Sequence, residues 1–247
     1  MDKLSVIKNS LDWRIRYLKS LRYYFYWSIK RYLHNCSNIF IKNDNKISIV
    51  VVGRNDNYGG NFSRRLEVTL DWNLSKIPVS ELIYVEWNNI PERESDCEWI
   101  TKKYPNSRCY IVSNEIHKKI STNPNIPLLE YHAKNVGIRR AKYDWILLVN
   151  ADVFLGLDVI NNLKRLNKKY VYGSHYINIE WNGEDITEKH LVNNIHAKFY
   201  CPANEKMENV VGNFILTHKD NWLKMTGYDE RLTNVRIGVD RNGLCQL

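Results

Sequence analysis

The sequence predicts an α/β domain with a central, mostly parallel sheet, preceded by a basic amphipathic helix. Apolar and β-branched runs recur along the chain, and segments with helical spacing separate them. A length of 247 residues allows one large core plus an appendage. The basic residues gather at the N-terminus, whereas the later chain is nearly balanced in charge. These observations divide the chain at residue 46.

Residues 1–46 form the basic arm. They contain ten Lys or Arg and three Asp, and therefore hold +7 of the net charge of +9. From Leu11 to Leu33, apolar side chains fall on one helical stripe with basic residues around it. The uncharged run Tyr23–Ile29 is too short to span a bilayer. We expect a helix on an anionic membrane surface, and packing on a protein surface remains the alternative.

Compartment and partners follow from the charge and the cysteines. The five Cys are scattered without a C-x-x-C pair, which favours free thiols in a reducing compartment. No apolar signal segment follows the start of the chain. Because the basic charge is confined to the arm, nucleic acid is not an expected partner. We expect a cytoplasmic protein, peripheral at a membrane.

The body spans residues 47–247. Its first half has the pattern of strands alternating with helices. A Gly- and Asn-rich loop from Gly53 to Asn61 follows the first strand and lets backbone N–H groups approach a ligand closely. The expected strands are Ile47–Val52, Glu81–Trp87 and Arg108–Val112, and the expected helices are Phe62–Leu74 and Asp96–Tyr104.

The central unit runs from Leu128 to Phe154. A helical pattern up to Ala141 leads into the continuous apolar run Trp145–Val149, which is typical of a strand covered on both faces. The strand ends at Asn150-Ala151-Asp152. Ligands bind beyond the carboxyl ends of strands in open α/β sheets, so an acid there is a candidate ligand for a hard cation. The alternative is an Asp that caps the helix starting near Leu157.

The last part of the body carries a second motif. Leu157–Leu166 reads as a helix and Tyr170–Tyr172 as a strand, whereas Trp181–Asn204 has no clear pattern. An apolar strand after Val210 precedes a short helix, and Gly227-Tyr228-Asp229-Glu230 and Asp240 follow. The alternative reading of this motif is an ordinary turn.

Two segments together resemble the GT-A glycosyltransferases, in particular a family-2-like enzyme. The run AKNVGIRRAKYDWILLVNAD is similar to the A-R-N-x-G segment and the apolar strand that end in D-x-D, although Asn150 replaces the first acid. The strand–helix unit that leads to GYDE and a later acid is similar to a second pattern of that family. The resemblance implies a GT-A, Rossmann-like single domain over 47–247.

The resemblance also implies a set of site residues. Asp152 would bind a divalent metal, Mn²⁺ or Mg²⁺. Asp240 would be the general base in an inverting reaction, with Asp229 as the alternative, and a retaining enzyme would need neither. The nucleotide-sugar donor would contact Gly53, Arg54, Asn55, Glu86, Lys134, Asn135, Arg139 and Asn150.

The implied function is that of a hexosyltransferase. It would move a sugar from a nucleotide-diphospho-sugar to a glycan, polysaccharide or glycolipid acceptor at a membrane surface. Two alternatives stay open. A catalytically silent GT-A-like protein that binds nucleotide or membrane would explain Asn150. A nucleotidyltransferase uses a similar sheet, but the chain lacks a G-x-G-x-R signature after its first strand.

Overall fold

The computed structural model of the chain describes Ile29 and the ranges 45–77, 80–174, 199–200 and 213–234. The chain divides into Met1–Asn43 and Asp44–Leu247, and the architecture below belongs to the second unit. The predicted helix Leu11–Leu33 lies outside the described residues, apart from Ile29, and so does Asp240. Within the described ranges, no helix has both the length and the apolar character required to cross a bilayer.

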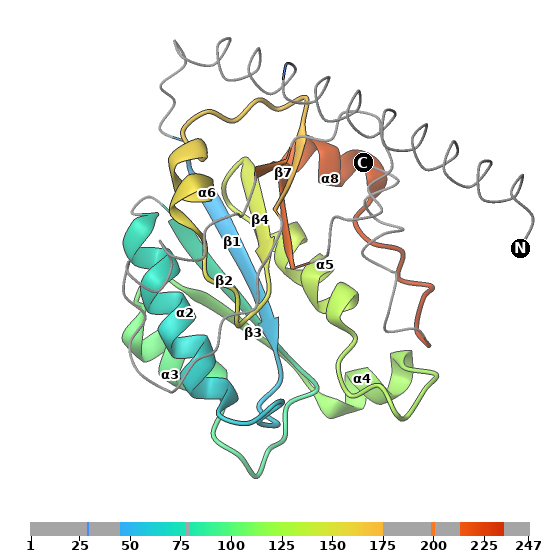
Figure 1. Cartoon of the computed structure of the whole chain (residues 1–247). Helices are drawn as coiled ribbons and strands as arrows, with labels where there is room; N and C mark the ends of the chain where they lie inside the picture. Colours follow the sequence, from blue (N-terminus) through green and yellow to red (C-terminus); the bar gives the residue numbers. More distant parts are fainter. Residues whose placement is uncertain (1–28, 30–44, 78–79, 175–198, 201–212, 235–247) are drawn as a thin grey trace, which may run out of the picture. The chain divides into compact units, whose positions relative to one another are not determined.

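The core of the body is a seven-stranded sheet with the order β3-β2-β1-β4-β7-β5-β6 (Figure 1). Strands β1 to β4 are mutually parallel, β7 is antiparallel to β4 and β5, and β6 is antiparallel to β5. Five of the seven strands therefore run in one direction, which confirms the predicted mostly parallel sheet. The strands are Ile47–Gly53 (β1), Ser80–Trp87 (β2), Arg108–Val112 (β3), Trp145–Val149 (β4), Val171–Ser174 (β5), Phe199–Tyr200 (β6) and Phe214–His218 (β7).

Helices cover both faces of this sheet (Figure 1). One apolar cluster joins the sheet to α2, α3 and α6, and a second joins the opposite face to α5 and α8. Every residue of β1 and β4 is buried, so the prediction of a strand covered on both faces is confirmed for Trp145–Val149. The helices are Phe62–Lys76 (α2), Asp96–Lys103 (α3), Asn114–Ile120 (α4), Glu130–Arg140 (α5), Leu157–Asn162 (α6) and Lys219–Met225 (α8).

Short elements account for most differences from the expected pattern. The seven-residue helix α4 and the two-residue strand β6 are too short to produce a recognisable hydrophobic period, and neither is predicted. Helix α6 ends at Asn162, before the expected Leu166, although Leu163 and Leu166 are still buried in the core. The apolar pattern in the sequence therefore continues past the end of the helix because the residues that follow are also buried.

Helix α5 lies unusually close to the sheet because of a glycine. A Cβ atom at Gly137 would stand 2.3 Å from Cγ1 of Val50 on β1, a distance that packed atoms do not tolerate. The glycine in the A-K-N-V-G run thus allows the helix to settle against β1. This contact fixes the helix turns that carry Lys134 and Asn135.

Candidate functional site

The loop after β1 begins with a packing glycine. A Cβ atom at Gly53 would lie 2.3 Å from the Tyr84 hydroxyl and 2.8 Å from the Phe62 ring. The loop then turns through left-handed conformations, with φ of 58° at Asn57 and 50° at Asn61. Gly53 therefore serves the close packing of β1 on β2 and α2, and the turn that follows brings the chain to the start of α2.

Arg54 and Asn55 connect this loop to the loop after β2. The Arg54 Nε donates to the Asn88 carbonyl at 2.8 Å, and its guanidinium pairs with Asp56 at 2.9 Å. The buried Asn55 amide donates to the Ile90 carbonyl at 3.0 Å and accepts from the Ile90 N–H at 2.8 Å. Both side chains thus hold the rim of the sheet together at the carboxyl ends of β1 and β2.

Glu86 lies at the end of β2, but its carboxylate faces helix α3. One carboxylate oxygen accepts from the Ser95 hydroxyl at 2.7 Å and from the Cys97 N–H at 3.0 Å, and so caps the start of the helix. Burial raises the pKa of Glu86, and its second oxygen has no partner among the described residues. A fully buried side chain offers no surface to a nucleotide, so the position of Glu86 does not support the predicted contact with the nucleotide-sugar donor.

The N-A-D triplet follows β4, as predicted. The Asn150 amide donates to the Asn213 side-chain oxygen at 3.0 Å, and its own oxygen accepts from the Lys134 ammonium at 3.3 Å. Asn150 therefore links α5 to the segment just before β7. Its replacement of an acid leaves a neutral side chain beside a buried cation.

Lys134 is fully buried in α5, next to a carboxylate. Its ammonium lies 2.5 Å from a Glu130 carboxylate oxygen, one helix turn earlier, and 5.3 Å from the centre of the Tyr131 ring. A buried charge must be paired or hydrogen-bonded to be tolerated. Together with Asn150, these neighbours hold the ion pair of Lys134 and Glu130 at the carboxyl end of β4.

Asp152 is half-exposed and is engaged by an arginine. The Arg65 guanidinium lies 2.6 Å from the Asp152 carboxylate, and the two residues are 87 positions apart in sequence. Arg65 is not among the site residues predicted from the sequence. Its signal is its place in the first turns of the helix after β1, which parallel-sheet topology returns to the same edge as the end of β4.

A divalent metal does not fit the donor set around this triplet. Asp152 is its one carboxylate, and that group is already paired with Arg65. The oxygen of Asn150 accepts from an ammonium group. Among the residues that the structure describes, no three His, Cys, Asp or Glu gather as metal ligands. The predicted metal role of Asp152 is therefore unsupported by the chemistry of its neighbours.

The two motifs that resemble GT-A enzymes are joined by Asn135. Its fully buried amide donates to the Tyr228 carbonyl at 2.9 Å and to a Glu230 carboxylate oxygen at 2.9 Å, and its oxygen accepts from the Tyr228 N–H at 2.8 Å. Gly227 stands beside it with φ of 85°, and a Cβ there would lie 2.4 Å from the Asn135 oxygen. The A-K-N segment therefore clamps the GYDE turn.

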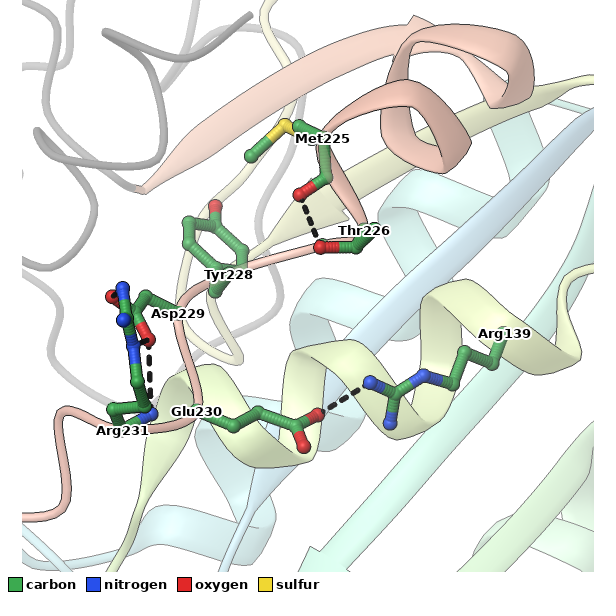
Figure 2. A pocket seen from close by; sticks show the side chains of 8 residues that line it. Arg139, Met225, Thr226, Tyr228, Asp229, Glu230 and Arg231 are labelled. Atoms are coloured by element: carbon green, nitrogen blue, oxygen red, sulfur yellow. Dashed lines mark hydrogen bonds and ion pairs between the residues drawn. The ribbon is translucent and has the colours of Figure 1, made fainter.

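Figure 2 shows the hollow that this turn forms over α5. It measures about 330 Å³ and is lined by Arg139 and by residues 225–231. Arg139 pairs at 2.7 Å with the same Glu230 oxygen that Asn135 contacts. Because Glu230 pairs with Arg139, the predicted contact of this arginine with the nucleotide-sugar donor would require that ion pair to open.

Asp229 is held by the neighbouring Arg231 (Figure 2). Its two oxygens accept from the guanidinium at 2.9 and 2.8 Å, and one also accepts from the Arg231 N–H at 3.0 Å. These hydrogen bonds lower the pKa of Asp229 to about 2. A general base works best with a pKa near the working pH, so Asp229 is poorly suited to that role.

Comparisons with known proteins give matches only among solved structures. Neither the known protein families nor the curated proteins contain a match to this sequence. The mannosyltransferase PcManGT from Pyrobaculum calidifontis, solved in complex with GDP-Man and Mn²⁺, is 13% identical, with 74% of this chain and 47% of that chain covered and a TM-score of 0.45. S. aureus TarS (residues 1–349) is 12% identical, with 81% and 54% covered and a TM-score of 0.47.

A third similar structure is the 4-diphosphocytidyl-2C-methyl-D-erythritol synthase from Anaerococcus prevotii. It is 15% identical, with 74% of this chain and 75% of that chain covered and a TM-score of 0.41. The chain spans about half the length of PcManGT and of the TarS chain, 47% and 54%. At these identities and TM-scores, the likenesses identify no substrate, metal or mechanism. The fold that the GT-A resemblance predicts, an α/β domain on a mostly parallel sheet, is confirmed by the strands themselves.

Proposed function

We propose that the chain is a glycosyltransferase that moves a hexose from a nucleotide-diphospho-sugar to a glycan, polysaccharide or glycolipid acceptor. One observation carries the proposal. The two motifs that resemble GT-A enzymes lie 93 residues apart, and the Asn135 side chain binds the Tyr228 backbone in both directions. Independent chance matches would have no reason to meet. Asn150 and Asp152 follow β4 at the carboxyl edge of the parallel strands, where such sheets bind ligands.

The reaction requires two kinds of group. The departing nucleoside diphosphate needs positive charge near its phosphates, and the acceptor hydroxyl must lose a proton as the new bond forms. Arg65 is a partly exposed cation beside the end of β4, whereas Lys134 is buried there and paired with Glu130. For the base we propose Asp240, from its place after the GYDE motif, since both oxygens of the alternative, Asp229, already accept from the Arg231 guanidinium.

A donor panel tests the function. The full chain is incubated with nucleotide-sugars that differ in base and sugar, and free nucleoside diphosphate is measured with and without glycan or lipid-linked acceptors. We expect one donor to release diphosphate faster when an acceptor is present. Binding without turnover would favour the catalytically silent alternative. Release of pyrophosphate from a nucleoside triphosphate and a sugar phosphate would instead favour a nucleotidyltransferase.

We also propose that the chain works on the cytoplasmic side of a membrane, bound peripherally through residues 1–46. The support is the +7 charge of that arm and its apolar stripe. The full chain should sediment with anionic vesicles and not with neutral ones. Binding should weaken as salt rises, because the screening length falls to about 8 Å at physiological ionic strength. Equal binding to neutral vesicles would contradict this proposal.

A further inference from the structure

We propose that Arg65 binds the diphosphate of the donor in place of a divalent metal ion. This inference rests on the proposed function and adds the means by which the leaving group is neutralised. It follows from the groups that occupy the end of β4, where the GT-A resemblance implies a metal. One carboxylate oxygen of Asp152 pairs with Arg65 there, and the side-chain oxygen of Asn150 accepts from Lys134.

Arg65 is held in place by two hydrogen bonds to backbone carbonyls and one ion pair. Its Nε donates to the Gly60 carbonyl at 3.2 Å, one terminal nitrogen donates to the Tyr58 carbonyl, and the other pairs with Asp152 at 2.6 Å. An arginine has five N–H donors, and these contacts use three of them. The guanidinium is therefore oriented by the loop after β1 and keeps donors for a phosphate, with 21% of its side chain exposed.

Lys134 lies on the other side of the triplet and is fully buried. Its ammonium contacts the oxygen of Asn150, while Arg65 contacts Asp152, two residues further along the same loop. The ammonium also pairs with the Glu130 carboxylate at 2.5 Å, so its charge is balanced within the protein. The neutral Asn150 adds no negative charge beside Arg65 at this strand end. The replacement of an acid by Asn is therefore consistent with a site that binds an anion through Arg65.

Binding experiments on the full chain test this role directly. Titration calorimetry measures the dissociation constants of inorganic pyrophosphate and of UDP, GDP, CDP and dTDP, in EDTA and in excess Mn²⁺ or Mg²⁺. We expect pyrophosphate and one of the nucleoside diphosphates to bind. The dissociation constant of each should be the same in EDTA, in Mn²⁺ and in Mg²⁺. A metal-dependent gain of tenfold or more in the unmodified chain would overturn the inference and leave the proposed function intact. Failure of every nucleoside diphosphate to bind in any condition would overturn both.

Substitutions on helix α2 distinguish a specific role of Arg65 from a general effect of positive charge on that helix. Arg65→Gln should weaken diphosphate binding about tenfold or more, since it removes the charged hydrogen-bond donor. Arg65→Lys keeps the charge but loses the fork, so its loss should be intermediate. Arg64→Gln is the matched control, because it removes one positive charge from the residue just before Arg65. Arg64 is exposed and pairs with Glu67 at 2.8 Å. Equal losses for Arg64→Gln and Arg65→Gln would overturn the role of Arg65.

Asp152→Asn gives opposite results for the two accounts. If Asp152 binds a metal that holds the diphosphate, the variant should lose diphosphate binding in Mn²⁺. If Arg65 holds the diphosphate, the variant releases the guanidinium from its ion pair, and binding in EDTA should stay equal or become tighter. Thermal melting of each variant verifies that the fold is kept. Loss of binding in a folded Asp152→Asn variant would refute our proposal.

Discussion

The contact between Asn135 and the GYDE turn can be tested by removing one side chain. Asn135→Ala deletes three hydrogen bonds, two with the Tyr228 backbone and one with Glu230. Both Asn135 and Tyr228 are buried, so water cannot replace the lost partners without a rearrangement. The variant therefore leaves a buried N–H and a buried carbonyl unsatisfied.

The size of the effect follows from those two groups. An unsatisfied buried donor or acceptor costs about 1–3 kcal/mol, so the free energy of unfolding should fall by roughly 2–6 kcal/mol if the turn stays in place. Rearrangement of the turn would bring the loss toward the lower end. For a domain of this size, each kcal/mol lowers Tm by about 2–4 °C, so a loss of about 3 kcal/mol predicts a fall of roughly 6–12 °C.

Urea unfolding followed by circular dichroism measures this loss, and Asn125→Ala is the matched control. Asn125 is an exposed residue of the loop before α5, so its truncation should change stability little. Asn135→Asp is a second variant, since its carboxylate would face the Tyr228 carbonyl and the Glu230 carboxylate. It should be less stable than Asn135→Ala at neutral pH. Wild-type stability in Asn135→Asp would refute the clamp.

Three further variants test other steps of the reasoning. Gly137→Ala forces a methyl group against Val50 and should cost about 1–3 kcal/mol in urea unfolding, whereas unchanged stability would refute the close contact. The folded pKa of Glu86 lies above its ordinary value of 4.5, so its contribution to stability is present below pH 4.5 and is lost as pH rises through the folded pKa. Glu86→Gln should remove that pH-dependent loss, and an unaltered pH profile would count against the raised pKa. Asn150→Asp cannot donate to the Asn213 oxygen, so it should lower Tm without creating Mn²⁺ binding measurable by calorimetry.

The sequence allows much of this framework to be predicted because most of it is local. Trp145–Val149 is the same segment in the prediction and in the structure, since five consecutive apolar residues leave little choice of boundaries. The strand-end position of Asp152 follows directly from that segment. Its ion pair with Arg65 does not, because the pair joins residues 87 positions apart and depends on β1 and β4 being neighbours.

Glu86 shows a different limit of sequence reasoning. Its place at the end of the second strand is predicted correctly, but a carboxylate at a strand end can face a ligand or a helix start. In this structure the Ser95 hydroxyl and the Cys97 N–H, both at the start of α3, donate to the carboxylate, which therefore faces the helix. Local pattern fixes where the residue lies along the chain, whereas its direction depends on the packing of α3.

The side chains around Asn150 also bear on whether the chain is catalytically silent. If the metal-binding acid were lost and nothing replaced the metal ion, the site would have too little positive charge to neutralise a diphosphate. Here the same position contacts Lys134, a fully buried lysine, and its amide contacts Asn213 across the strand edge. The Glu130 carboxylate, 2.5 Å from the ammonium, balances that lysine within the protein, so the donors left for a ligand at this edge are those of Arg65. The partly exposed Arg65 guanidinium near a neutral Asn150 therefore favours an anion-binding site over a degenerate metal site.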